Sequence, residues 1–271
     1  MTTPIFIDTH AHLDDPAFDH DRDDVFARAA ANGVRRVINV GYRPERWKST
    51  IALCQRYPLA AHMLGLHPHH ADDWSAKTES DLLSLAQTTS PVAIGEIGLD
   101  YFRPGPASEA QAEAFNRQLT LALELGLPAV IHQRAAEEDL ISNLIKEVRA
   151  SQVLLHSFEG TNRLANLVND RGFYVGVGGL ATRTGSEALR QVLRRISLDR
   201  VVLETDSPYL SPAGSAVRRN TPATIPLIAE RLAPIWDVDQ AAFAAATTTN
   251  AERLFGPLIS GGQRSPMERD A

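Results

Sequence analysis

Cysteine and lysine are the scarce residues of this chain. Of its 271 residues one is cysteine, Cys54, and three are lysine, whereas 24 are arginine. A single cysteine excludes an intramolecular disulfide framework and a cysteine-rich zinc module. We expect Cys54 to lie on a helix face as a small buried side chain, and not to act as a nucleophile.

The sequence also lacks a long apolar run and an excess of positive charge. No stretch approaches the apolar length that spans a bilayer. The N-terminus has no basic region, apolar run and cleavage site of a signal peptide, so we expect a cytoplasmic protein. The net charge is -6, so no global basic field attracts nucleic acid, and any recognition of anions must be local.

Short apolar runs recur along the chain, and each is followed by a segment with helical character. The runs are continuously apolar, which is typical of parallel strands buried on both faces. Eight strand–helix pairs predict an α/β fold, a single-domain (β/α)8 TIM barrel over residues 1–256, with a flexible tail over 257–271. A doubly wound open sheet is the alternative. The predicted strands cover about residues 5–12, 36–40, 61–67, 91–96, 129–132, 153–156, 173–177 and 200–204.

The motif His10-Ala11-His12 closes the first apolar run. Side chains alternate between the two faces of a strand, so both imidazoles leave it on the same side. Two imidazoles at the end of a strand form half of a metal site. For the motif taken alone, a pair of structural histidines is the alternative.

Further candidate ligands follow other predicted strands in the same way. Glu96 ends the fourth strand, His132 the fifth and His156 the sixth, and Asp206 follows the eighth. In a barrel these ends converge on one mouth, where active sites form. Four imidazoles and two carboxylates suit an open hydrolytic site for Mg²⁺, Mn²⁺ or Zn²⁺, in which a carboxylate can bridge two ions. A closed structural zinc site needs only four ligands, so six predict two divalent metal ions.

Six motifs stand on or near these strand ends, and a seventh closes the fold: Asp8-Thr9-His10-Ala11-His12-Leu13, Gly65-Leu66-His67-Pro68, Gly95-Glu96-Ile97-Gly98-Leu99-Asp100-Tyr101, Ile131-His132-x-Arg134, His156-Ser157-Phe158, Glu204-Thr205-Asp206-Ser207-Pro208-Tyr209 and, last, Asn250-Ala251-Glu252-Arg253-Leu254-Phe255. Together they resemble the TatD-type metal-dependent deoxyribonucleases, which belong to the amidohydrolase-like barrels. The resemblance runs from residue 5 to about residue 255.

The resemblance implies a metal-dependent hydrolase that cleaves DNA phosphodiester bonds as an exonuclease, acting on single strands or accessible ends. A water activated by two divalent ions would attack phosphorus, and Asp206 would orient it and take its proton. The implied ligands are His10, His12 and Asp206 for one metal, His132 and His156 for the second, and Glu96 as the bridge between them.

His67 resembles an additional active-site histidine of the family. The resemblance implies that it contacts phosphate or protonates the leaving group. A histidine that fixes the turn before Pro68 is the alternative, because lone histidines often satisfy local backbone.

Phosphate needs cationic partners, and arginine suits bidentate contact with it. The excess of arginine over lysine shows nothing alone, since a GC-rich genome gives the same bias. Position is more informative: Arg134, Arg218 and Arg219 resemble family motif positions, and we expect them to bind substrate. The arginines that follow predicted strands are Arg43, Arg103, Arg134, Arg163, Arg183, Arg218 and Arg219.

Two acidic residues lie close to the candidate ligands in the sequence. Glu204 points away from the ligands, and we expect it to support a neighbouring ligand or to form an ion pair. Glu159 stands where the family more often has serine. Its carboxylate either weakens contact with the DNA backbone or pairs with an arginine such as Arg163. The alternative is that it stabilises the positive N-terminal end of the helix that starts near Asn162.

Three other functions stay open. A metal-activated water could attack a carbonyl, as in a D-aminoacyl-tRNA deacylase, an activity reported within related proteins. A small-molecule amidohydrolase or phosphotriesterase is disfavoured, because these often use a carbamylated lysine as the bridge and none of the three lysines stands at the end of a predicted strand. A metal-dependent binding scaffold is disfavoured because all six ligands and a candidate base are present. The expected partner is therefore DNA, with no membrane and no obligate protein partner.

Overall fold

Strands and helices alternate along the chain in the computed structural model, which describes residues 4–147, 152–216, 218–256 and 259. Within these residues there are eight strands: β1 (Phe6–Ala11), β2 (Val34–Gly41), β3 (Ala60–Leu64), β4 (Ile94–Asp100), β5 (Ala129–Arg134), β6 (Val153–Leu155), β7 (Tyr174–Val177) and β8 (Val201–Leu203).

Each strand is followed by at least one helix. The α-helices in the same part of the chain are α1 (Arg22–Ala31), α2 (Pro44–Arg56), α3 (Ala76–Thr89), α4 (Ser108–Glu124), α5 (Glu137–Glu147), α6 (Asn162–Arg171), α7 (Glu187–Leu193), α8 (Ile225–Leu232) and α9 (Gln240–Phe255). Short 3-10 turns lie between them: η1 (Pro16–Phe18), η2 (Pro68–Asp73), η3 (Gly179–Thr182), η4 (Leu198–Arg200), η5 (Pro222–Thr224) and η6 (Ala233–Trp236).

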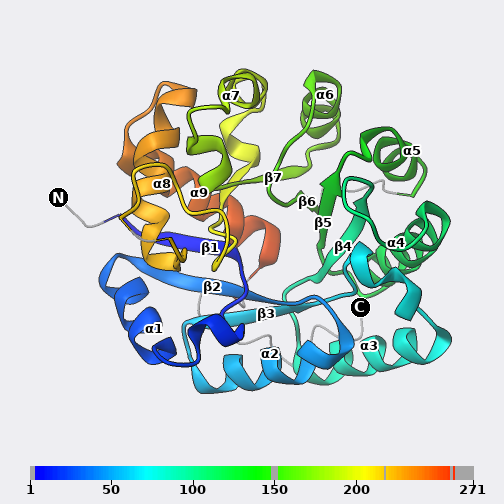
Figure 1. Ribbon diagram of the computed structural model, residues 1–271. Helices are drawn as coiled ribbons and strands as arrows, with labels where there is room; N and C mark the ends of the chain where they lie inside the picture. Colours follow the sequence, from blue (N-terminus) through cyan, green and yellow to red (C-terminus); the bar gives the residue numbers. More distant parts are fainter. Residues whose placement is uncertain (1–3, 148–151, 217, 257–258, 260–271) are drawn as a thin grey trace.

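The strands form one parallel sheet in the order β1 to β8. The helices surround this sheet as an outer ring (Figure 1). Parallel strands need crossover connections, and helices supply them here on the outer face. The predicted TIM barrel is therefore confirmed, and the doubly wound open sheet is wrong.

The barrel closes between β1 and the segment that follows β8. Among the described residues no ladder joins these two strands, and the link is a single bridge between Ala11 and Ser207. The backbone N–H of Asp206 donates to the carbonyl oxygen of His10 (2.8 Å), and that of His12 donates to the carbonyl oxygen of Ser207 (2.7 Å). We call this contact the seam; three of the predicted metal ligands lie on it.

Two apolar layers hold the barrel together, because neighbouring residues of a strand face opposite sides. Phe6 of β1 packs in the layer between sheet and helices, whereas the next residue, Ile7, packs in the inner cluster. Leu254 and Phe255 of α9 join that inner cluster. Cys54 of α2 is half-buried against the outer layer, and burial raises the pKa of its thiol, as expected for a packing residue.

The fourth strand differs from the sequence prediction. It was expected to end at Glu96, but β4 continues to Asp100 because Ile97–Asp100 pair with Ile131–Arg134 of β5. Glu96 therefore lies inside the strand. Most of the tail predicted over residues 257–271 lies outside the described residues; Ile259 is described, and it is buried in the inner cluster. None of the described helices is both long and apolar enough to cross a membrane.

Candidate active site

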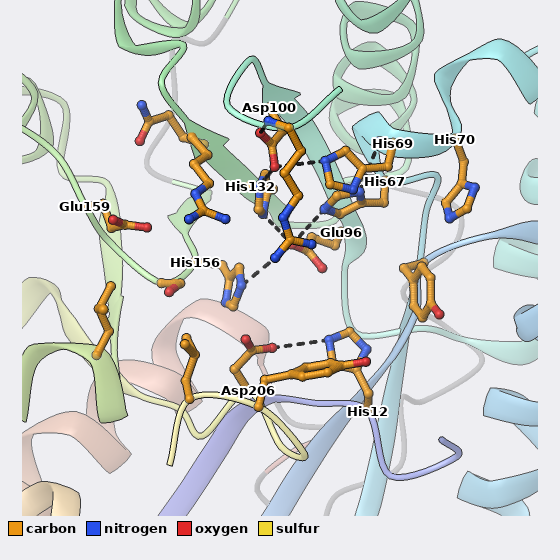
Figure 2. Close-up of a pocket in the computed structure, with 18 of the residues that line it drawn as sticks. His12, His67, His69, His70, Glu96, Asp100, His132, His156, Glu159 and Asp206 are labelled. Carbon is orange, nitrogen blue, oxygen red and sulfur yellow. Dashed lines mark hydrogen bonds and ion pairs between the residues drawn. The ribbon is translucent and has the colours of Figure 1, made fainter. Parts of the chain in front are cut away.

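A cavity of about 530 Å³ opens where the strands end. It contains five of the six predicted ligands, and the sixth, His10, is fully buried directly behind them. Figure 2 shows Glu96 at the centre of the labelled cluster, with His67, His132 and His156 close around it. The five ligands that line the cavity are His12, Glu96, His132, His156 and Asp206.

The first group of candidate ligands lies across the seam. Ligand atoms of His10, His12 and Asp206 all lie within 4.8 Å of one another. His12 Nε2 is 3.3 Å from Asp206 Oδ1, and His10 Nε2 is 3.8 Å from the same oxygen. The sequence prediction that His10 and His12 share a face is confirmed.

Glu96 lies at the centre of the remaining candidate ligands. Its Oε2 faces His10 Nε2 at 3.4 Å, and its Oε1 lies 2.8 Å from His132 Nδ1 and 3.6 Å from His156 Nε2. Two further groups of three residues meet the same 4.8 Å limit, and both contain Glu96. These groups are His10, Glu96 and His156, and His67, Glu96 and His132.

The charges of this cluster attract a cation. Burial raises the pKa of Glu96, but the imidazoles of His67, His156 and His10 outweigh it and hold this pKa well below its ordinary value. Burial lowers the pKa of His156, yet the carboxylates of Glu204 and Glu96 raise it to about 10. The carboxylates therefore stay ionised and draw protons onto neighbouring imidazoles, and a divalent ion would replace those protons.

The residues fit a divalent metal. His10 is fully buried, and neither of its ring nitrogens makes a hydrogen bond with a described residue. A buried polar group without a partner is costly, and a bound ion would supply one. The donor set of imidazole nitrogens and carboxylate oxygens suits Zn²⁺ or Mn²⁺, and its carboxylates suit Mg²⁺.

Two carboxylates contact the ring nitrogens of His156 and His132 that do not face Glu96. Glu204 Oε1 lies 3.1 Å from His156 Nδ1, as expected for a neighbouring ion-pair partner, and accepts from the backbone N–H of Ser157 at 2.7 Å. A Cβ on Gly176 would lie 2.0 Å from Glu204 Oε2, so the carboxylate fills the space that glycine leaves. Such contacts fix the orientation and tautomer of a ligating histidine.

Asp100 plays the same part for His132, and the sequence analysis did not assign it a role. Its Oδ2 lies 3.2 Å from His132 Nε2 and 2.9 Å from His69 Nε2. Its Oδ1 accepts from the backbone N–H groups of Phe102 and Arg103. A signal was present: Asp100 stands four residues after Glu96, on the same face of one strand, if the strand is taken to continue.

The contacts of His67 combine the two predicted possibilities, since one ring nitrogen binds the local backbone and the other faces the candidate ligands. Its Nδ1 accepts from the backbone N–H of His69 (3.1 Å), and its Nε2 is 3.6 Å from Glu96 Oε1. Burial lowers its pKa to about 3, so the ring is neutral at neutral pH and carries its proton on Nε2. Nε2 is then a hydrogen-bond donor, which favours contact with an anion over ligation of a metal through that atom.

The predicted substrate-binding arginines separate into two groups. Arg134 lines the cavity, and its guanidinium lies 4.1 Å from the centre of the Phe102 ring. Arg219 instead pairs with Asp21 (2.5 Å), and neither it nor the exposed Arg218 is among the residues that line the cavity. Two other arginines on the strand-end side, Arg103 and Arg183, do line it.

Glu159 is exposed on the rim of the cavity. The expected pairing with Arg163 is wrong, because Arg163 pairs with Glu138 (2.5 Å). The N-cap of α6 is Thr161, whose side chain accepts from the backbone N–H of Arg163. Within the described residues no partner neutralises the Glu159 carboxylate, so its charge faces the mouth of the barrel.

Comparisons with known proteins show the family of this chain. The model of the family described as TatD related DNase matches residues 7–256. The 3'-5' ssDNA/RNA exonuclease TatD of Escherichia fergusonii is 37% identical over 256 residues, which cover 92% of this chain and 98% of that protein. The uncharacterized metal-dependent hydrolase YabD of Bacillus subtilis is 33% identical, with 93% and 99% covered.

Solved structures show the same fold. The crystal structure of YJJV, a TatD homologue from Escherichia coli, superposes with a TM-score of 0.87 and 30% identity, covering 92% of this chain and 97% of that one. The hydrolase of the TatD family from Entamoeba histolytica superposes with a TM-score of 0.86 at 24% identity, with 95% and 100% covered. This chain therefore belongs to the TatD-related DNase family of metal-dependent hydrolases.

Proposed function

We propose that this protein is a metal-dependent phosphodiesterase that removes nucleotides from the ends of single-stranded DNA. The observation that carries the proposal is the buried Glu96 carboxylate, which has imidazoles from four segments around it at the floor of an open cavity. The names of relatives such as the E. fergusonii exonuclease support single-stranded nucleic acid as the substrate.

We propose two divalent ions at this centre, Mg²⁺, Mn²⁺ or Zn²⁺. When bound, they would neutralise charge on the phosphate and lower the pKa of the attacking water. The assignment follows the family resemblance. The close grouping of the ligand atoms of His10, His12 and Asp206 supports the assignment for the first ion. The proposed ligands are His10, His12 and Asp206 for one ion, and Glu96, His132 and His156 for the other, with Glu96 shared by both.

The side chains supply the remaining steps. Asp206 faces the cavity; burial raises its pKa, but the hydrogen bond from His12 and the charge of His156 lower it below the ordinary value, so it is an ionised base. As the water oxygen bonds to phosphorus and the bond to the leaving oxygen breaks, the water proton passes to Asp206, which then returns it to the leaving oxygen to give the free hydroxyl. His67 donates its Nε2 proton in a hydrogen bond to the phosphate, and Arg134 binds the neighbouring backbone.

The test is product analysis with metal-reconstituted protein. Labelled single-stranded DNA, duplex DNA, RNA and a D-aminoacyl-tRNA are incubated with wild type and with Asp206→Asn. We expect single-stranded DNA to be shortened from one end, and no cleavage by the variant. Deacylation of the tRNA without cleavage of any phosphodiester bond would overturn the proposal. The single catalytic domain over residues 1–256, the cytoplasmic location and the lack of an obligate protein partner stay predictions.

A further inference from the structure

An aromatic wall borders the cavity on the side of the first ligand group. Tyr42, His70 and Tyr209 all line the cavity beside His12. The ring centres of Tyr42 and Tyr209 lie 5.4 Å and 6.0 Å from that of His12, and His70 lies 6.0 Å from Tyr42. We use the name aromatic wall for Tyr42, His70 and Tyr209.

Tyr209 is the most exposed member of the wall, since 54% of it is accessible to solvent. Its hydroxyl makes no hydrogen bond with a described residue, and no described apolar side chain covers the ring. An aromatic side chain normally buries its ring in a core or an interface. Here the ring is left open next to a candidate metal site.

The backbone holds Tyr209 in place. Its N–H donates to the carbonyl oxygen of Asp206 (2.8 Å), which places the ring one tight turn after a proposed ligand. The backbone N–H of the buried Asn220 donates to the carbonyl oxygen of Pro208 (3.0 Å), and its side chain donates to that of Thr205 (2.8 Å). Because its backbone is already ordered, only the side-chain rotations of Tyr209 lose conformational freedom when a ligand stacks on the ring.

An acidic side chain without a neutralising partner among the described residues lies on the opposite side of the cavity. Figure 2 shows Glu159 and His70 on opposite sides of the labelled cluster. Beyond Glu159 a second, adjoining cavity is lined by the acidic side chains of Glu137, Glu138 and Asp139. The Glu159 carboxylate therefore disfavours a phosphate on its own part of the rim, whereas the aromatic wall contains no acidic side chain and offers an approach to the candidate metal ligands.

We propose that Tyr209 is a stacking platform for the base of the nucleotide whose phosphate lies at the His12–Asp206 group. The inference rests on the proposed function and adds a base subsite to it. Every base has a π face, so such a platform tolerates all sequences. A base in a duplex is already paired and stacked, so the platform favours an unpaired end, and it explains how an acidic protein selects single strands.

The experiment compares two probes that differ only in the base. Binding of 2'-deoxyadenosine 5'-monophosphate and of 2'-deoxyribose 5-phosphate to Mn²⁺-loaded protein is measured by calorimetry, for wild type, Tyr209→Leu and Tyr209→Phe. Base–aromatic stacking corresponds to an affinity gain of about 5- to 150-fold. We expect wild type to prefer the nucleotide by this factor and Tyr209→Leu to lose the preference with unchanged affinity for the sugar phosphate. Tyr209→Phe should restore it.

The matched control is Leu123→Ala, which removes another exposed apolar side chain, on α4 and away from the cavity. It should leave the preference for the nucleotide unchanged. Equal binding of the two probes to wild type, no binding of the nucleotide, or an unchanged preference in Tyr209→Leu would each overturn the inference. If Tyr209→Leu loses the preference while wild type cleaves no DNA, the base subsite stands and the proposed phosphodiesterase is overturned.

Discussion

His62 is a buried histidine whose ionisation we expect to limit stability at low pH. It lies in β3, is 7% exposed, and its Nε2 is 3.0 Å from Thr89 Oγ1 at the end of α3. The Thr89 hydroxyl donates to the carbonyl oxygen of Leu85 (2.8 Å), so its oxygen accepts the hydrogen bond from the Nε2–H of His62. The neutral ring is satisfied by this contact, and a second proton on Nδ1 would be buried as a charge.

The size of the effect follows from the pKa. Burial lowers the pKa of His62 from 6.5 to about 4. Between pH 6.5 and pH 4, His62 binds a proton in the unfolded chain but stays neutral in the folded chain. The free energy of unfolding therefore falls as the pH decreases towards 4. At 1.36 kcal/mol for each pH unit, the loss between pH 7 and pH 4 is about 3 kcal/mol.

The assay is urea denaturation of metal-free wild type and His62→Gln between pH 7.5 and pH 4. Glutamine keeps a polar group near Thr89 but does not ionise. The metal-site histidines titrate in both proteins, so their effect cancels in the difference between the two curves. Wild type should lose about 2 to 3 kcal/mol more than the variant over this range. The exposed His20 provides the control, and His20→Gln should follow wild type. Parallel curves for wild type and His62→Gln would refute the reasoning.

Three further predictions concern the cavity. Glu96→Ala should abolish turnover while circular dichroism shows an intact fold, because the carboxylate contacts ligands and the barrel rests on its apolar layers; full activity under limiting metal would contradict the bridging role. His67→Ala should lower turnover but keep the metal content, and loss of one metal equivalent by elemental analysis would make His67 a ligand. Glu159→Ser should tighten binding of single-stranded DNA at low salt, with an unchanged Tm and a benefit that fades as salt rises; unchanged binding with a lower Tm would assign Glu159 to the fold.

The fold and the clustering of the candidate ligands follow from local patterns, which is why the sequence predicts them. Parallel strands are buried on both faces, so their apolar runs mark their positions, and residues at their ends meet at the mouth. The role of Asp100 was not predicted, because the length of β4 depends on its pairing with β5 and no local sequence pattern shows that pairing. Likewise Arg219 follows a strand as expected, but its guanidinium pairs with Asp21, a residue 198 positions away.

The base subsite needed the structure for a similar reason. Tyr209 stands in a motif that the sequence analysis quoted, yet nothing in the sequence says that its ring stays uncovered. Exposure depends on what the other loops bring to the rim. It also depends on the buried Asn220, whose hydrogen bonds to the carbonyl oxygens of Pro208 and Thr205 fix the backbone next to Tyr209.

The seam couples the catalytic centre to the integrity of the barrel. A metal held by His10, His12 and Asp206 would span β1 and the segment after β8, so it would act as a clasp across the one place where a strand ladder is missing from the described sheet. An ion that binds only the closed form stabilises it, by about 2.7 kcal/mol at a hundred times its Kd. An ion bound there would therefore serve the proposed catalysis and also stabilise the closed barrel, and amide exchange at His12 and Asp206 would report both effects.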